Sequence, residues 1–501
     1  MANPYTDITE FTNTIMGNPF ALYDEDFTRE EMLRINKEIM YWRFYRGQQW
    51  STKRITGEPQ NTVNYCRAFV DKGVSFLMGK GFSIKVKSDA NEITKPFLDE
   101  VWDDNNRELV ALDIAQAGGV TGNAWAKVVV EEFDEDELPF MKELYPNGRV
   151  RIIILPTYTV FPTWHAHDRD KMVKCKIVYP IMVENVRIDG SVSYEEVWYK
   201  EEITSEYIKE YMDGNLIEER ENLLREIPVV RIKNLPLAGE PLGMSDLQDI
   251  IPLQKELNYK STDISDIINY HAAPITVIIG AKGSNLEKGA RKIWSGLPKD
   301  ASVFNLELKG ELKAASDYLD FIKTSMFELA HMPEDAFGKK LNISNTSGVA
   351  LHIKNQPLME LTRSKNITYG EGIRQINKLI LRYGELIDHP GLDVGKFNGL
   401  KPAERYWTKI EFPDPLPKDE LIQMQLIAQK IALYLLSRKD AMAQLGETEA
   451  EEKLDKILEE TMMIQDKIYD AQSKAEESLR ENIGGVLTRD EKVKPDNEDD
   501  E

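Results

Sequence analysis

Three long helical patterns, separated by two short segments of other character, occupy the chain between residues 252 and 388. Apolar residues recur at the spacing of an α-helix in each of them. In order, the segments are a helix at 252–271, a small αβ block with strand-like runs at 275–279 and 301–308 around a short helix at 286–295, a return helix at 314–332, a polar loop at 333–347 and a helical pattern at 348–388. Pro357 lies inside the last pattern, where we expect a kink because an internal proline removes a backbone hydrogen bond. This ordered set restricts the fold more than any single motif.

Helices are predicted in the chain from Thr28 onward. Thr28 and Glu31 match a capping box, which predicts a helix that begins at Thr28 and ends near Gly47. A second helical pattern covers 61–78. A third covers 91–117, and the glycines that follow it, Gly118, Gly119 and Gly122, are expected to break it.

One short strand pattern precedes the helix at 91–117, and strand patterns dominate the chain after it to about residue 233. They cover 82–86, 124–130, 149–155, 174–179, 195–200, 207–212 and 229–233. Asp189-Gly190 and Asp213-Gly214 are typical hairpin turns. The first half is therefore predicted to contain a meandering antiparallel sheet. Together with the helical second half, this gives an α+β, mainly helical fold.

The C-terminal region carries a heptad repeat. After a strand-like segment at 408–412, an amphipathic helix is predicted at 418–437. Beyond it, apolar or small residues alternate at spacings of four and three, at Ala450, Leu454, Ile457, Thr461, Ile464, Ile468, Ala471 and Ala475. Such spacing is typical of a coiled-coil seam, although threonine and alanine weaken this one. The charged residues after 482 predict a disordered tail.

The charge of the chain limits its partners. The net charge is −22, and residues 447–501, with 19 acidic and 8 basic residues, contribute half of that excess. A chain of this charge does not hold nucleic acid on a broad cationic surface. No apolar run approaches the 18 residues of a membrane span, and the start lacks the pattern of a secretory signal. Two cysteines cannot form a disulfide framework.

No motif in the sequence indicates an enzyme. Gly79-Lys80-Gly81 lacks the glycine spacing and the Ser or Thr of a phosphate-binding loop, so we interpret it as a helix end. His165 and His167 lie two residues apart, but a metal site needs ligands from elsewhere, and a polar surface turn is the simpler interpretation. We therefore expect no catalytic residue, no metal and no cofactor.

The loop at 333–347 is the most suggestive segment. It combines Lys339 and Lys340 with Asn342, Asn345 and neighbouring Ser and Thr side chains, between two long helices. Lysine offers a point charge to phosphate without reading bases. The loop is either an ordinary surface loop or a finger that touches a polyanion.

The order of these elements resembles the portal proteins of tailed bacteriophages, in particular the siphophage head–tail connector type. Three local stretches carry further likeness: NYCRAFVDKGVSFLMGKGFSIKV at 64–86, PLGMSDLQDIIPLQKELN at 241–258 and IEFPDPLPKDE at 410–420. The resemblance covers residues 30 to 460, and the later heptads and acidic tail are not part of it.

The resemblance implies a division of the chain into the parts of a portal subunit. These are an N-terminal arm (1–27), a wing (28–240 with 395–417), a first stem helix (241–271), a clip (272–312), a second stem helix (313–332), a tunnel loop (333–347), a long kinked helix (348–394), a crown (418–482) and an acidic disordered tail (483–501). Lys339, Lys340, Asn342 and Asn345 would then face DNA, and Pro357 would mark the kink.

It also implies a location and partners. Portal proteins form rings, dodecamers by resemblance, at one capsid vertex of the virion, after assembly in the host cytoplasm. Double-stranded DNA passes through the ring during packaging and ejection. The expected protein partners are further copies of the chain, the terminase large subunit, the head–tail adaptor protein, and the major capsid and scaffolding proteins, with no membrane involved.

Two alternatives remain open from the sequence. One is another phage head-assembly protein, organised by its C-terminal coiled coil. The other is a hydrolase or nuclease that uses some of the 85 carboxylates, whose abundance makes carboxylate pairs uninformative.

Overall fold

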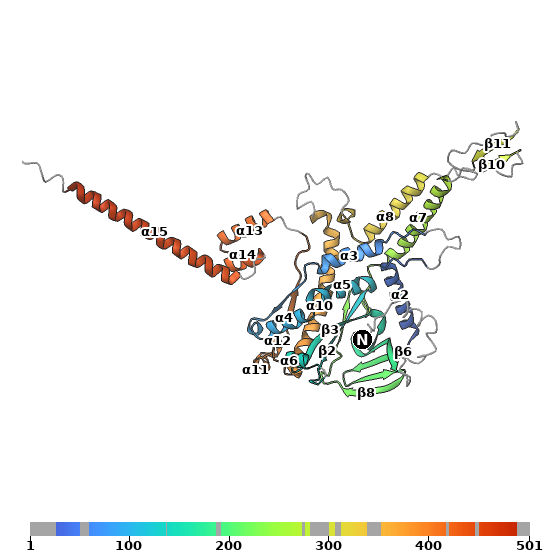
Figure 1. The fold of residues 1–501 in the computed structure, drawn as a ribbon, viewed down its shortest axis with the longest axis horizontal. Helices are drawn as coiled ribbons and strands as arrows, with labels where there is room; N and C mark the ends of the chain where they lie inside the picture. Colours follow the sequence, from blue (N-terminus) through green and yellow to red (C-terminus); the bar gives the residue numbers. More distant parts are fainter. Residues whose placement is uncertain are drawn as a thin grey trace, which may run out of the picture. The chain divides into compact units, whose positions relative to one another are not determined.

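The computed structural model describes residues 27–50, 60–136, 138–186, 192–272, 276–280, 300–305, 312–337, 352–416, 420–445 and 450–487. The chain divides into two compact units, Met1–Leu416 and Pro417–Glu501, and each is described by itself. Helices and sheets are combined in the first unit, as predicted for an α+β fold (Figure 1). Within the described residues, no helix has the length and apolarity of a membrane span.

The N-terminal helices follow the sequence signals in part, and α3 begins four residues later than the pattern at 61–78 predicted. Helix α2 (Arg29–Tyr45) begins with the predicted capping box of Thr28 and Glu31. It is followed by α3 (Tyr65–Met78), α4 (Thr94–Asp104) and α5 (Arg107–Thr121). The single helix predicted at 91–117 is wrong, because Asn106 adopts a left-handed conformation (φ 57°) and caps a new helix by accepting the N–H of Leu109.

The glycines after residue 117 behave differently from the prediction. Gly118 and Gly119 lie within α5, and the helix ends only at Gly122, whose φ of 92° suits glycine.

A three-stranded antiparallel sheet lies at the centre of the first unit. Its order is β3 (Arg149–Leu155), β2 (Asn123–Glu131) and β9 (Val229–Lys233). Successive side chains of β2 point to opposite faces of the sheet. Ala124 and Ala126 pack in a core with α5 and α10 (Gln356–Leu386), whereas Trp125 packs in a second core with the larger sheet. The sheet therefore lies between a helical layer and another sheet.

The larger sheet is the predicted meander. Its five strands run in the order β4 (Val160–His165), β5 (Asp168–Val186), β6 (Val192–Thr204), β7 (Tyr207–Met212) and β8 (Asn215–Glu221). The predicted turn at Asp213-Gly214 joins β7 to β8, with positive φ at both residues. Asp189-Gly190 lies outside the described residues. Strand β8 was not predicted from the sequence. Every residue in it is exposed, so its sequence lacks the apolar alternation that predicts a strand.

Strands distant in the chain form a small ribbon. β1 (Ser83–Val86) pairs antiparallel with β12 (Thr408–Glu411), Ser83 opposite Glu411. This pairing joins the segment after α10 to the N-terminal helices. The remaining short elements of the first unit are η1 (Ser88–Ala90), α6 (Pro139–Leu144), η2 (Thr157–Thr159), η3 (Glu334–Phe337), α11 (Val394–Gly399) and α12 (Pro402–Arg405).

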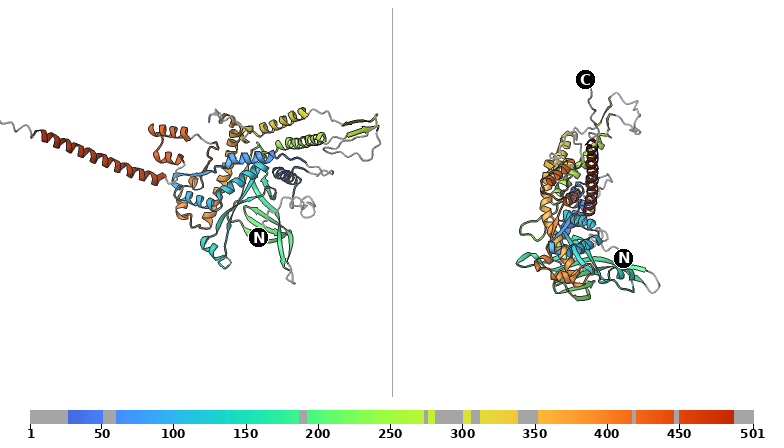
Figure 2. Two further views of the ribbon diagram at one scale, coloured as in Figure 1. Left: turned by 45° about the horizontal axis from the view of Figure 1, so that its top comes forward. Right: turned by 90° about the vertical axis from the view of Figure 1, so that its left-hand side faces the viewer.

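Two long helices pack side by side, as Figure 2 also shows. They are α7 (Ile250–Ala272) and α8 (Leu312–Leu329). Between them in the chain, β10 (Thr276–Ile279) and β11 (Ser302–Asn305) form an antiparallel hairpin. The predicted helix at 286–295 lies outside the described residues. The helix–hairpin–helix order matches the sequence prediction.

Helix α10 begins later than the sequence predicted. We expected one helix from 348 with a kink at Pro357, but α10 starts at Gln356 and Pro357 lies in its first turn. A proline costs little there, because the first N–H groups of a helix have no intrahelical partner. Residues 352–354 form a separate helical turn.

The second unit is helical. The helix predicted at 418–437 forms only as α13 (Glu420–Ala432), and Tyr434 follows it at a φ of 56°. A separate helix, α14 (Arg438–Gln444), begins just after the predicted range. The heptad segment forms one 38-residue helix, α15 (Ala450–Leu487). Its last turn includes residues 483–487, which we had assigned to the disordered tail.

Candidate functional site

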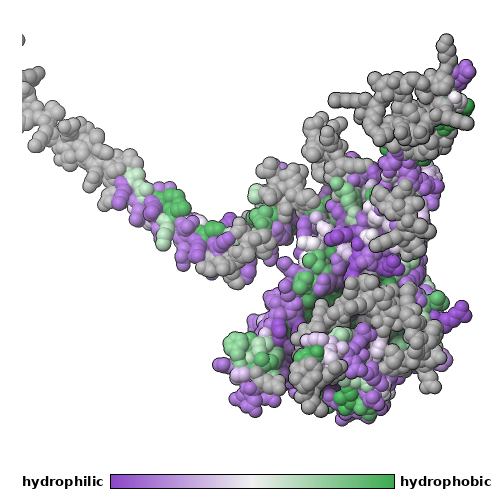
Figure 3. All heavy atoms as spheres, turned by 45° about the vertical axis from the view of Figure 1, so that its right-hand side comes forward, coloured by the Kyte–Doolittle hydropathy of each residue, from purple (hydrophilic) through white to green (hydrophobic). Residues whose placement is uncertain are grey.

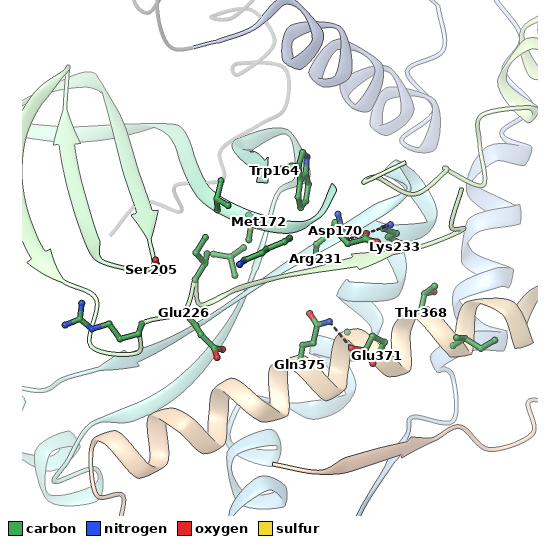
Figure 4. Close-up of a pocket in the computed structure, with 17 residues that line it drawn as sticks. Trp164, Asp170, Met172, Ser205, Glu226, Arg231, Lys233, Thr368, Glu371 and Gln375 are labelled. Carbon is green, nitrogen blue, oxygen red and sulfur yellow. Dashed lines mark hydrogen bonds and ion pairs between the residues drawn. The ribbon is translucent and has the colours of Figure 1, made fainter. Parts of the chain in front are cut away.

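A large groove lies between α10 and the two sheets (Figure 4). It has a volume of about 880 Å³. Trp164 of β4 and Met172 of β5 lie on one side, Arg231 and Lys233 of β9 line its base, and Glu371 belongs to α10. The remaining lining residues that Figure 4 labels are Asp170, Ser205, Glu226, Thr368 and Gln375.

Arg231 contacts two of the other residues that line this groove. Its guanidinium carbon lies 4.5 Å from the ring centre of Trp164, and one guanidinium nitrogen donates to Asp170 at 3.0 Å. Lys233 donates to the same carboxylate at 2.9 Å, and these two cations lower the pKa of Asp170. Burial lowers the pKa of Arg231. Its Nε and Nη1 are buried and have no hydrogen-bond partner among the described residues.

A second polar cluster, the α10 lock, joins α10 to the segment before α7. Lys365 of α10 contacts Asp246 at 2.6 Å, and both side chains are mostly buried. Asn234 donates to the other oxygen of Asp246 at 2.7 Å and accepts the Tyr369 hydroxyl at 3.0 Å. The ring of Tyr369 lies directly against the backbone of Gly118 in α5. The lock therefore joins α10, α5, the segment before α7 and the end of β9 at one point.

A third polar cluster, the α7 ladder, lies along the buried face of α7. Gln254, Asn258 and Thr262 occur every four residues, and all three are almost fully buried. They accept the backbone N–H groups of residues 65, 63 and 61 respectively, each at 3.1 Å. Gln254 also donates to the carbonyl of Val63 at 2.6 Å. The backbone of the segment before α3 is thus held by hydrogen bonds to side chains of α7.

The residues predicted to touch DNA are not among those described. Lys339, Lys340, Asn342 and Asn345 all lie outside the described ranges. Pro357 is described, at the start of α10.

The described side chains do not assemble the parts of a nucleophilic or metal site. Both cysteines are buried, and burial raises the pKa of the Cys66 and Cys175 thiols to about 12, which disfavours the reactive thiolate. His165 and His167 are exposed around the turn that joins β4 to β5. Within the described ranges, no three His, Cys, Asp or Glu side chains are placed to hold a metal ion.

Comparison with known families identifies the chain. The family described as "Phage portal protein, SPP1 Gp6-like" matches residues 7–467. The chain belongs to the phage portal proteins. The resemblance found in the order of elements is thereby confirmed, and the match ends within α15. A search of curated proteins finds no match. Portal proteins are a structural family, not a catalytic one.

The residues that organise this portal protein were mostly missed by the sequence analysis. Lys365 and Asp246 are 119 positions apart, and no local pattern links them. The α7 ladder could have been found, because amide and hydroxyl side chains at 254, 258 and 262 repeat on the apolar side of a helical pattern. Such residues are unusual on a buried face unless they are hydrogen-bonded.

Proposed function

We propose that this portal protein forms a closed ring at one capsid vertex and that double-stranded DNA passes through the ring during packaging and ejection. Membership of the portal family is the observation that carries the proposal. By resemblance the ring holds twelve copies, α7 and α8 form the stem, the β10–β11 block forms the clip, and residues 418–482 form the crown.

Exposed apolar side chains on the paired helices support assembly. On α8, Tyr318 and Phe321 are 44% and 65% exposed and stack on each other at 6.4 Å. On α7, Tyr259 and Ile268 are about half exposed. Solvated aromatic side chains in a group mark protein interfaces. A heterologous contact between such faces closes into a ring when its rotation allows.

The charge of the chain suits a conduit. Each phosphate contact adds salt-dependent affinity that has to be broken before DNA advances. A net charge of −22 keeps such contacts few. Lys339 and Lys340 of the expected tunnel loop would supply weak contacts that do not depend on base sequence.

The partners follow from this role. We infer that the terminase large subunit docks on the clip and supplies the energy of packaging, because the chain has no nucleotide-binding motif. The head–tail adaptor protein would take the same surface later, and the major capsid and scaffolding proteins would surround the wing. The protein would then reside in the virion, after assembly in the host cytoplasm.

Two substitutions test the proposal. Phe321→Glu should prevent ring formation in light scattering, because it places a charge in the expected interface, whereas Ser316→Glu, on an exposed position of the same helix, should not. Lys339→Ala combined with Lys340→Ala should leave the ring intact and reduce DNA packaging or retention. Normal rings from the Phe321 variant would contradict the stem interface, and an unchanged phage yield would contradict the tunnel-loop role.

A further inference from the structure

The groove beside α10 is bordered by two open strand edges. Among the described residues, β9 pairs only with β2, which leaves its other edge unpaired. Strand β5 extends past the end of β6, because its pairing with β6 begins at Lys174 and residues 168–173 pair only with β4. Residues of both edges line the groove, 170–173 of β5 and 229, 231 and 233 of β9 (Figure 4). Open edges of this kind present backbone donors and acceptors to which an extended segment can add as a strand.

The walls of the groove carry exposed apolar side chains. In the view of Figure 3, hydrophobic surface lies in patches among hydrophilic side chains. In the groove, Ile367 of α10 is 76% exposed and Val173 of β5 is 38% exposed, and Trp164 and Met172 lie beside them. The volume of about 880 Å³ falls within the range of about 300–1,000 Å³ that is usual for binding sites. The groove therefore offers both backbone pairing and apolar contact to an extended segment.

Positive charge dominates around the groove. Each acidic side chain that lines it is paired with cations of the same chain. The pairs are Asp170 with Arg231 and Lys233, Glu226 with Lys378 and Arg382, and Glu371 with Arg374. Lys171 adds a further exposed cation. Cations thus outnumber carboxylates here, in a chain whose net charge is −22, so an acidic segment suits the groove.

The N-terminal arm has the matching composition. Residues 1–26 lie outside the described part of the chain, and their sequence holds five acidic residues and no lysine or arginine. Within them, eight of the twelve residues at 5–16, YTDITEFTNTIM, are β-branched or aromatic. Such residues favour strands, and Pro4 and Gly17 bound the run on either side. The segment 5–16 is therefore an acidic, strand-forming sequence.

The arm leaves the described structure close to the groove. Phe27 lies against Phe161 of β4, with 4.6 Å between the ring centres. Strand β4 is an edge strand, and Trp164, three residues after Phe161, packs in the core on the other face of the sheet. The chain therefore has only to pass around the edge of β4 to enter the groove. Residues 17–26 can span about 33 Å, whereas three residues of a strand cover about 10 Å.

We propose that residues 5–16 bind in the groove of their own copy as an added strand between the open edges of β5 and β9. Phe11 and Ile8 would contact the apolar walls, and Asp7 and Glu10 would lie in the positive field around them. The bound arm would join the two sheets and α10 through one segment. This contact lies within a single copy and does not depend on the proposed ring.

Hydrogen exchange of the full-length protein tests the added strand. In the parent protein, peptides covering 168–173 and 229–233 should be protected, because the arm pairs with their open edges. Thr9→Pro combined with Thr12→Pro removes one backbone N–H from each side of the arm and should abolish this protection. Thr9→Ala combined with Thr12→Ala keeps both N–H groups and should preserve it. Peptides covering 174–179, which pair with both β4 and β6, should not change.

Cross-linking tests which copy supplies the arm. Phe11→Cys combined with Ile367→Cys, treated with a short bis-maleimide, should join the two peptides within one chain, which still runs as a monomer on a denaturing gel. Phe11→Cys combined with Leu386→Cys is the control, because Leu386 is exposed on the same helix about 28 Å further along. The native Cys66 and Cys175 are buried, so the parent protein is the blank.

The outcomes are separate from those for the ring. Rapid exchange at both open edges of the parent, protection that survives the proline pair, or equal linking to positions 367 and 386 would each overturn the proposal. Covalent multimers in place of internal links would overturn the assignment of the arm to its own copy. Light scattering of the same samples reports the ring independently, so a monomeric protein with a bound arm would contradict the proposed function alone.

Discussion

The ammonium group of Lys365 lies 2.6 Å from a carboxylate oxygen of Asp246, and both side chains are mostly buried. The contact holds α10 against the segment that leads into α7. In a ring, the long helix and the stem would therefore be coupled at this pair, which makes the α10 lock the first place to test the fold.

Lys365→Met should destabilise the protein by about 3–5 kcal/mol, because it leaves the Asp246 carboxylate buried without its cation. Thermal unfolding measures the loss. Lys396→Met removes an exposed ion pair with Asp393 and should change the stability far less, because solvent screens such a pair. Equal effects of the two variants would contradict the role of the α10 lock.

Gly118→Ala should destabilise the protein by about 1–3 kcal/mol through overpacking. A Cβ atom at Gly118 would lie 2.0 Å from the Tyr369 hydroxyl, whereas one at Gly399 meets nothing within 4 Å. Chemical denaturation of Gly118→Ala, with Gly399→Ala as the control, measures the difference. Tyr369→Phe in the Gly118→Ala background should recover part of the loss, and no recovery would show that the clash lies elsewhere.

Asn258→Ala should loosen the segment before α3. The Val63 N–H loses its acceptor, so its amide should exchange with solvent faster, and the neighbouring amides of residues 61 and 65 should follow. Hydrogen exchange measured by mass spectrometry on peptides covering 60–66 tests this. The control Asp263→Ala changes an exposed residue of the same helix. Unaltered exchange in the Asn258 variant would mean that the α7 ladder does not hold this segment.

His389 should make the protein less stable in mild acid. Burial lowers its pKa below the ordinary value of 6.5, although the carboxylates of Glu100 and Asp104 oppose the shift. The unfolded chain then binds a proton that the folded protein does not, so stability falls as the pH drops through about 6.5. Melting temperatures between pH 7.5 and 5.5 should decrease less in His389→Asn, which keeps an acceptor near the Gly391 N–H. An identical decrease would assign the effect to other groups.

Local signals in the sequence predicted much of the fold. The capping box of Thr28 and Glu31 and the turn at Asp213-Gly214 depend on residues within a few positions of each other, and both form as expected. The paired helices α7 and α8 followed from apolar periodicity. The break at Asn106 was missed because its left-handed conformation interrupts a continuous helical pattern.

Long-range contacts could not be predicted in this way. Ser83 pairs with Glu411, and Lys365 pairs with Asp246, through the topology of the whole unit and not through a local pattern. The same holds for the groove around Arg231, whose walls come from the three strands β4, β5 and β9, the loops beside them and helix α10. The tunnel-loop residues Lys339 and Lys340 remain a prediction from sequence and resemblance.

Native mass spectrometry of the purified full-length protein tests the central claim most directly. We predict a single closed oligomer, of twelve copies by resemblance, that persists across protein concentration and salt. A monomer under all of these conditions would contradict the account.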